Sequence, residues 1–338
     1  SMESPVARTS KDNGYGRADQ DAANLLLARM YLNAEVYTGT ARWADAKEYA
    51  EKVINGPHKL WTQGVAATQT HAAYSAYQML FMGDNGESGA SVEAILPILQ
   101  DGITTASYGT TLFLMASCWK DDMDVDKDYG SSGFWAGNRA RSQFVAKFFP
   151  NGDAPQVNIA NMAAAAGDDR ALLFGIDREL VVTTPSDYAS GYAVGKFRNT
   201  YSTGASAHNG LFADTDYFLM RSAEAYLIAA EADARINGGT TTATGANYIN
   251  ALRQRANTST RSEYTTDQIL DERSRELYYE GFRRTDLIRY GVYCNNKYLW
   301  DWKGGTLSGT AFSENRTVFA IPAEDINANP NLTQNPGY

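Results

Sequence analysis

Three glutamates near the end of the chain are the first residues whose type and spacing could do chemistry. Glu272, Glu276 and Glu280 stand four residues apart in the segment DERSRELYYEGFRRTDLIRYG. Paired carboxylates hydrolyse glycosidic bonds, but such a pair flanks the bond from opposite sides, whereas successive turns of one helix point the same way. Neighbouring arginines also lower carboxyl pKa values. We therefore expect ion pairs at helical spacing rather than catalysis: Arg273 with Glu276, and Glu280 with Arg283 or Arg284.

The remaining nucleophiles and bases form no catalytic set. His58, His71 and His208 are far apart in the sequence, and none stands in an HExxH motif, so each is expected in a loop or at the surface. Walker A and GxGxxG motifs are absent as well. Cys118 and Cys294 show no CxxC spacing, and a bridge between them cannot be argued from sequence. The sequence thus predicts a protein that is not an enzyme.

Aromatic residues are unusually frequent, with 21 Tyr, 13 Phe and 6 Trp. A ring face packs against the apolar C–H face of a sugar, while polar groups beside it hydrogen-bond the hydroxyls. Tyr108 precedes a glycine in ASYGTT, and Phe134 and Trp135 stand among small residues in GSSGFWAGNRAR. Asn138 and Arg141 follow as hydrogen-bonding candidates. We expect a glycan site here, with core packing of the rings as the alternative.

Two further groups of residues invite a binding role. Trp300 and Trp302 alternate in YLWDWKGG, which indicates either a second sugar platform or packing, and packing is favoured. GDNGE and ADTD bring carboxyl oxygens onto loops, which suits calcium although neither follows EF-hand spacing. Asp84, Asp214 and Asp216 could share one structural calcium; turn formation and helix capping are the favoured alternative. No other cofactor is expected.

The elements that position these residues read mainly as helices. Segments 21–35 and 43–54 carry apolar residues at helical spacing, with alanines that allow close contact, and are typical of a tetratricopeptide-like hairpin. Segments 216–236 and 246–256 repeat the design. A third helix is expected to open near Thr266, capped by Thr265 or Thr266, and to run through 271–291. Such hairpins stack into a superhelix.

A long irregular insertion interrupts this helical scaffold and is expected to face the glycan. Within it, residues 93–101 read as a short strand broken by Pro97, and 143–149 as helical. An Asn/Pro-rich extended tail closes the chain at 321–338. We expect one domain over 1–338, with a first hairpin at 17–57, the insertion at 58–214, later repeats at 215–292 and the extended tail at 293–338.

Bulk composition excludes several partners. The net charge of −9 over 338 residues argues against nucleic acid, which requires Lys and Arg to neutralise phosphates. The basic stretch Arg253–Arg261 reads as a solvated helix end. No apolar run reaches the roughly 18 residues of a membrane span, and SMESPVARTS lacks the features of a signal peptide.

Several long segments resemble the SusD/RagB family, the cell-surface glycan-binding lipoproteins of Bacteroidota. They are YGRADQDAANLLLARMYLNAEVYTG, WADAKEYAEKVI, FLMRSAEAYLIAAEADARING, DERSRELYYEGFRRTDLIRYG and PNLTQNPGY. ILPILQDG, AAGDDRALL and NKYLWDWKGG are similar to a starch-binding member. The resemblance implies that Tyr108 and Trp135 fall where that member carries its stacking Tyr and Trp. The loop WKDDMDVDKDYGSS departs from that member in sequence and length, which affects the shape of the site.

The resemblance also implies a cellular role. Family members bind glycan at the outer membrane and deliver it to a SusC-type TonB-dependent transporter. The family has a region before this chain begins, with further helices, part of the glycan site and the lipid-anchoring cysteine. We therefore expect non-catalytic binding of α-glucan, that is, starch or malto-oligosaccharide. The alternatives are a SusD-like binder of another glycan and a tetratricopeptide-type scaffold for a protein partner.

Overall fold

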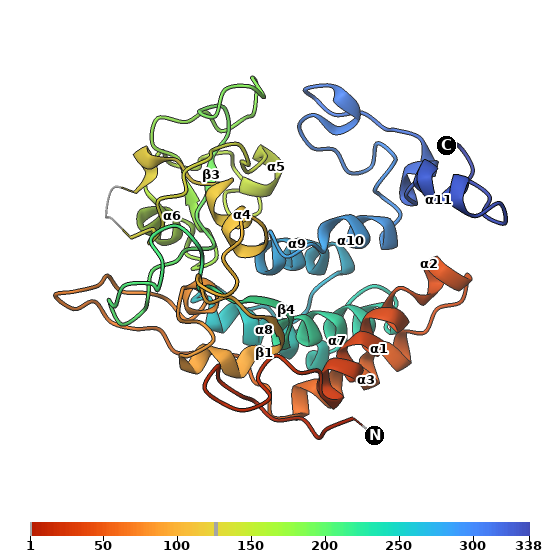
Figure 1. The fold of residues 1–338 in the computed structure, drawn as a ribbon. Helices are drawn as coiled ribbons and strands as arrows, with labels where there is room; N and C mark the ends of the chain where they lie inside the picture. The colour runs from red at the N-terminus through yellow and green to blue at the C-terminus, as the bar shows by residue number, and fades with distance from the viewer. Residues whose placement is uncertain (1, 125–127) are drawn as a thin grey trace. The chain divides into compact units, whose positions relative to one another are not determined.

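The computed structural model describes residues 2–124 and 128–338 and is mainly helical, as predicted (Figure 1). The chain divides into two compact units, residues 1–280 and 281–338. Within the described residues, no helix is both long and apolar enough to cross a membrane.

The helical scaffold of the first unit begins with the predicted hairpin. Helix α1 (Gln20–Leu32) and helix α3 (Trp43–Asn55) are joined through the short α2 (Ala34–Thr38), and α3 also packs along α7 (Ser222–Ile236) (Figure 1). The contact is rich in fully buried alanines, whose short side chains let the helix axes approach. They lie on all three helices: Ala28, Ala46, Ala50, Ala225, Ala229 and Ala232.

The later repeats continue the scaffold with α8 (Ala243–Arg255) and α9 (Thr266–Leu277). Thr265 caps α9 through a capping box with Gln268, which confirms one of the two predicted caps. The strand β4 (Tyr217–Arg221) precedes α7, so the predicted helix over 216–236 was wrong at its start. These residues pair antiparallel with β1 (Ala94–Ile98), and the register shifts next to Pro97, which cannot donate to the ladder.

Gly245 of α8 offers a direct test of how closely these helices pack. A Cβ at this position would lie 2.2 Å from Oδ1 of Asp233. Asp233 cannot easily yield, because Thr242 donates to Oδ1 and Lys47 donates to Oδ2 at 2.8 Å. We expect Gly245→Ala to lower the free energy of unfolding by about 1–3 kcal/mol, measured by urea denaturation. Alanine normally stabilises a helix by about 1 kcal/mol over glycine, so a gain in stability would contradict this packing.

The predicted continuous helix over 271–291 is wrong. Helix α9 ends at Leu277, and α10 (Arg283–Arg289) begins in the second unit. Tyr279 and Gly281 between them have positive φ values of 60° and 84°, which no α-helix accommodates. The boundary between the two units follows Glu280, inside this break.

The closing tail is not extended throughout. Residues Ala323–Ala328 form the short helix α11, directly after Pro322. Glu324 and Asp325 occupy its first turn, where the helix dipole favours acidic residues. The frequent Asn and Pro residues suggested a wholly extended tail. They nevertheless leave room for this one short helix.

The insertion has short elements but a large hydrophobic core of its own, which the sequence did not reveal. Buried rings including Tyr77, Phe81, Trp119, Tyr129 and Tyr192 belong to one cluster. Its regular elements are α4 (Thr110–Ala116), α5 (Ser142–Val145), α6 (Ile159–Ala166), β2 (Leu173–Phe174) and β3 (Ala193–Val194), and the two strands pair antiparallel. The predicted helix over 143–149 is thus present but shorter. Irregular backbone here lies over a packed core and can hold side chains in fixed positions.

The glutamate series is buried in a network of ion pairs between distant elements. Glu276 accepts from Arg221 at 2.7 Å, Arg255 at 2.5 Å and Arg170 at 3.3 Å. Ion pairing was predicted correctly, but the local partners were not the main ones. The other glutamates also reach across the fold: Glu272 pairs with Arg170, Arg253 and Arg275, and Glu280 with Arg221 and Lys196.

Two smaller expectations are also settled. His58 lies in a loop but is buried, and its Nδ1 is 3.0 Å from Oδ2 of Asp21. The expected loop location is therefore confirmed, and the contact with Asp21 of α1 accompanies the burial of the ring. Cys118 and Cys294 are both buried free thiols.

Candidate glycan-binding site

Three aromatic rings gather on the exposed surface of the insertion. Tyr108, Trp135 and Phe113 are 63%, 40% and 50% exposed. The ring centroids of Tyr108 and Trp135 are 6.1 Å apart, and those of Trp135 and Phe113 are 6.5 Å apart. The planes are tilted by 41° and 54°, so the rings follow one another without forming a single flat plane. We call these three rings the aromatic face.

Backbone hydrogen bonds fix the aromatic face to helix α4. The amide of Trp135 donates to the carbonyl of Ala116 at 2.9 Å, and that of Asn138 donates to Ser117 at 2.8 Å. The loop that carries Trp135 is thereby tied to the end of the helix that carries Phe113. Tyr108 lies just before the first residue of the same helix. All three rings therefore depend on one short helix for their positions.

Other aromatic residues support this face from beneath. Phe212 meets Tyr108 edge to face at 5.3 Å and is partly buried. Phe134 lies 5.2 Å from Tyr129 and packs against the core of the insertion. Phe134 therefore packs inward, whereas its neighbour Trp135 is exposed.

The predicted polar candidates follow in the same loop. Asn138 is exposed, and its side-chain amide donates to the hydroxyl of Ser117 at 2.9 Å, which holds the side chain in place. Arg141 is exposed and precedes α5. Exposed amide and guanidinium groups of this kind can hydrogen-bond a ligand rich in hydroxyls.

Phe113 was not recognised from the sequence, although a signal for it exists. In the segment TTLFLMA, Leu112, Met115 and Ala116 share the buried face of a helix, and Phe113 falls outside that face. Seven residues were too few to predict a helix before the structure was known. Once the helix is assigned, its periodicity places Phe113 outward.

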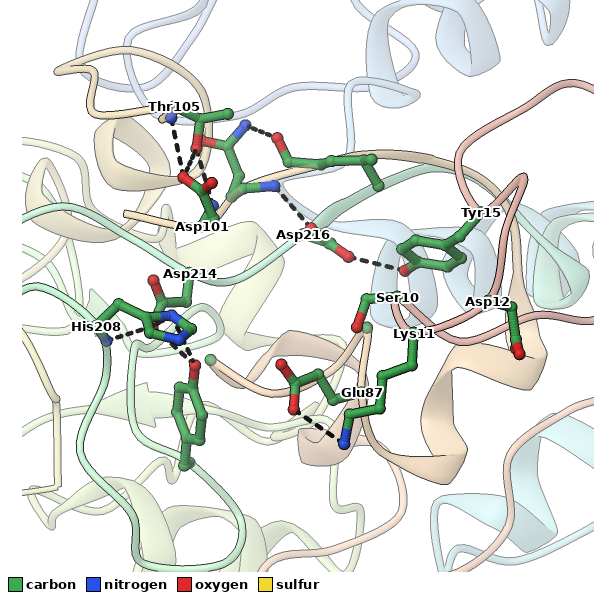
Figure 2. Close-up of a pocket in the computed structure, with 15 residues that line it drawn as sticks. Ser10, Lys11, Asp12, Tyr15, Glu87, Asp101, Thr105, His208, Asp214 and Asp216 are labelled. Atoms are coloured by element: carbon green, nitrogen blue, oxygen red, sulfur yellow. Dashed lines mark hydrogen bonds and ion pairs between the residues drawn. The ribbon is translucent and has the colours of Figure 1, made fainter. Parts of the chain in front are cut away.

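A polar pocket of about 350 Å³, here called the Asp214 pocket, opens in the same unit (Figure 2). Asp214 accepts from the hydroxyl of Tyr201 at 2.9 Å and lies 3.3 Å from Nδ1 of His208. Asp216 accepts from Tyr15 at 2.8 Å (Figure 2). Gln100 connects this pocket to the aromatic face. It lines the pocket, and its side-chain oxygen accepts a hydrogen bond from the hydroxyl of Thr110 at the start of α4.

The three aspartates proposed for calcium are all buried and near this pocket. Asp84 accepts from the amide and hydroxyl of Ser202. Burial, with the charges of Asp214 and Glu87, raises the pKa of Asp216 to about 6. Oδ1 of Asp214 is buried and has no hydrogen-bond partner among the described residues. No group of three or more acidic, His or Cys side chains in the described part of the chain is arranged as a ready metal shell.

In the second unit, Trp300 packs against neighbouring aromatic rings. The ring of Trp300 lies 6.2 Å from Tyr293 and 6.5 Å from Phe312, and both Trp300 and Trp302 are only partly exposed. The ammonium of Lys303 is 4.5 Å from the Trp300 ring. These contacts favour the packing interpretation over a second platform.

The chain thus combines a helical-hairpin scaffold with an insertion that presents a fixed aromatic face. The SusD family model matches residues 183–338. The starch-binding protein SusD of Bacteroides thetaiotaomicron is 40% identical over 357 aligned positions, covering 96% of this chain and 61% of that protein. The chain thus spans less than two thirds of this relative.

Solved structures show the same fold. A SusD-like protein from Bacteroides fragilis superposes with a TM-score of 0.66 at 18% identity, covering 100% of this chain and 68% of that one. Surface glycan-binding protein A from Bacteroides thetaiotaomicron, in complex with laminarihexaose, gives 0.61 at 20% identity, with 99% and 66% covered. The chain is therefore similar to the SusD family over residues 183–338 and shares the fold of SusD-like proteins.

Proposed function

We propose that this chain binds α-glucan, that is, starch or malto-oligosaccharide, through the aromatic face and without turnover. The observation that carries the proposal is the row of three exposed, tilted rings held by α4. Successive ring planes that differ by tens of degrees suit a curved glucan better than a flat ribbon. The starch-binding relative supports the choice of glucan, because it is similar along nearly the whole chain.

The proposed contacts divide by chemistry. Tyr108 and Trp135 stack on sugar faces, and Phe113 extends the row. Asn138 and Arg141 donate to hydroxyls, and Phe134 supports the loop from beneath. Net affinity is expected to be modest, with gains from binding several segments of one polysaccharide.

The state of the buried carboxylates supports binding without hydrolysis. Glu272 and Glu276 are fully buried and ion-paired, so no substrate reaches them. Neighbouring arginines overcome burial and lower the pKa of Glu272 to about 2, which rules it out as a general acid near neutral pH. Release of reducing sugar from starch would overturn this part of the proposal.

We further propose the location and partner that the similarity to SusD-family proteins suggests. The whole protein would sit at the outer-membrane surface, held by a lipid anchor in a region preceding this chain, and would pass oligosaccharides to a SusC-type TonB-dependent transporter. A nucleic-acid partner is disfavoured by the net charge of −9.

Calorimetry against maltoheptaose, laminarihexaose and a xylo-oligosaccharide tests the proposed ligand. We expect heat from maltoheptaose alone. Heat from another oligosaccharide alone would identify a SusD-like binder of a different glycan. The third possibility, a protein-binding scaffold with buried aromatics, is disfavoured because Trp135 and Tyr108 are exposed.

We also propose Asp84, Asp214 and Asp216 as the residues that would hold a calcium ion. The support is the burial of all three carboxylates, the position of Asp214 and Asp216 at one pocket, and the Oδ1 of Asp214, which has no hydrogen-bond partner among the described residues. Calcium binds carboxylate oxygens and would offset the cost of burying their charge. The competing interpretation is that the hydrogen bonds these aspartates already accept are their whole role.

Chelation separates the two interpretations. If calcium is held, EGTA is expected to lower the melting temperature by several degrees, and added Ca²⁺ but not Mg²⁺ should restore it. Asp214→Asn should abolish the response to calcium. An unchanged melting temperature after chelation would leave these aspartates with turn formation and capping alone.

A further inference from the structure

A second pocket, of about 480 Å³, lies on the helical scaffold and shares no lining residue with the aromatic face. Its lining includes Tyr226 of α7 and Gln254 and Arg255 of α8. Its walls come from the segments 59–64 and 75–76. We call it the Tyr226 pocket. Its volume is within the range of about 300–1,000 Å³ typical of small-molecule sites.

The ring of Tyr226 is held rigidly at this pocket. Tyr248 of α8 meets it edge to face, with centroids 6.1 Å apart and planes at 87°. The hydroxyl of Tyr248 in turn donates to Glu51 of α3 at 2.8 Å. Three helices therefore fix the orientation of one half-buried ring, which is the support that sugar stacking requires.

Two cations line the pocket, and one of them is paired with buried carboxylates. Arg255 is fully buried and donates to Glu93 at 3.1 Å and to Glu276 at 2.5 Å. Its Nε, however, is buried with no hydrogen-bond partner among the described residues. Lys59 donates its ammonium to the carbonyl of Ile54 at 2.8 Å. The two carboxylates balance the charge of Arg255, and its Nε–H can donate to a ligand that brings a hydrogen-bond acceptor.

The wall opposite the helices is tied to the same buried glutamate. The amide of Trp61 donates to Glu93 Oε2 at 2.9 Å, the oxygen that also accepts from Arg255. Gly64 lets the two walls approach, since a Cβ there would lie 2.5 Å from the carbonyl of Tyr74. The pocket is therefore a built feature of the fold and not a gap between loose loops.

The pocket also has polar lining residues of the kind that bind sugar hydroxyls. Thr62, Gln254 and Asn257 are exposed at the rim, and Ser75 lies further in. Hydroxyl and amide groups can both donate to and accept from sugar hydroxyls. No acidic side chain is found among the described residues that line the pocket.

We propose that the Tyr226 pocket is a second saccharide subsite, which takes a short neutral oligosaccharide segment of two or three sugars. The sugar stacks on Tyr226 and hydrogen-bonds Gln254, Thr62 and Asn257. This inference rests on the proposed function for the class of ligand, but on different residues for the site. Two subsites on one chain strengthen binding to a polysaccharide far more than binding to a short oligosaccharide.

Calorimetry with maltotriose, and crystals soaked in maltotriose, test the proposal. The wild type is compared with Tyr108→Ala/Trp135→Ala, which removes the aromatic face, and with that variant carrying Gln254→Ala or Tyr226→Phe in addition. Gln63→Ala is the matched control, because Gln63 is exposed in the same wall segment but does not line the pocket. Circular dichroism confirms that each variant is folded.

We expect the double variant to retain weak maltotriose binding with density over Tyr226. Gln254→Ala should weaken that binding at least tenfold, and Gln63→Ala should leave it unchanged. If the wild type binds but the double variant does not, the second subsite is refuted and the proposed function stands. If the wild type binds no tested glycan, the proposed function fails. If the soaked sugar occupies another place, the pocket assignment fails.

Discussion

The variant Tyr108→Ala/Trp135→Ala is expected to lose its retardation on native gels that contain amylose. Both rings are exposed and both are held by α4, so their loss removes stacking surface without disturbing the core. Central aromatic contacts at binding sites typically contribute about 2 kcal/mol or more each, which is roughly thirtyfold in affinity. Because the two rings are in contact, the double change should cost less than the sum of the single changes.

A matched control makes this result specific. Tyr37 on α2 is 68% exposed and lies far along the chain from the aromatic face, so Tyr37→Ala should migrate like the wild type. Phe113→Ala is expected to give an intermediate effect, since Phe113 forms the end of the row. Unchanged migration of the double variant would refute the site assignment, whatever the calorimetry shows for the wild type.

The variant Glu276→Ala is expected to be the most destabilising single change in the scaffold. It removes the carboxylate that Arg170, Arg221 and Arg255 share and leaves three buried guanidinium groups short of a partner. Removing one partner of a buried ion pair typically costs about 3–5 kcal/mol. Urea denaturation measures the loss directly, and Glu276→Gln, which keeps the hydrogen-bond acceptor, provides a milder variant if the alanine form does not fold.

Glu35→Ala is the control, because Glu35 is exposed on α2 and such changes usually stay within about 0.5 kcal/mol. A loss below about 1 kcal/mol for Glu276→Ala would show that the network is not coupled to folding as the geometry indicates. It would place the stability of the scaffold in its alanine contacts instead.

The same network fixes the pH dependence of stability. Paired arginines lower the pKa of Glu272 to about 2 from its ordinary value of 4.5, and they also lower that of Glu276. A carboxyl whose pKa is lower in the folded state stabilises the protein above the unfolded value and loses this contribution as pH falls through the folded value. We expect the contribution of these two glutamates to be flat above about pH 5 and to be lost from about pH 4.5 toward pH 2, which urea denaturation at a series of pH values measures.

The sequence alone determined the long helices of the scaffold and the family that its segments resemble. Apolar and alanine residues at helical spacing define α1, α3, α7 and α8, because this periodicity is a local property that tertiary packing only completes. The cap at Thr265 followed from the same kind of local chemistry. Tyr108 and Trp135 were selected as ring residues among small neighbours, and both are exposed.

Only the tertiary structure decided which distant groups meet. Glu276 was expected to pair along its own helix, but its partners come from segments up to about a hundred residues away, because a buried carboxylate requires more donors than one helix face supplies. The break at Tyr279 and Gly281 divides a helix whose polar pattern was continuous. Helix α4 and the loop that follows it are fixed over the core of the insertion. Their positions place Phe113 in the aromatic face and Phe134 against the core. Exposure and proximity are properties of the packed chain, so neither can be read from residue type and spacing.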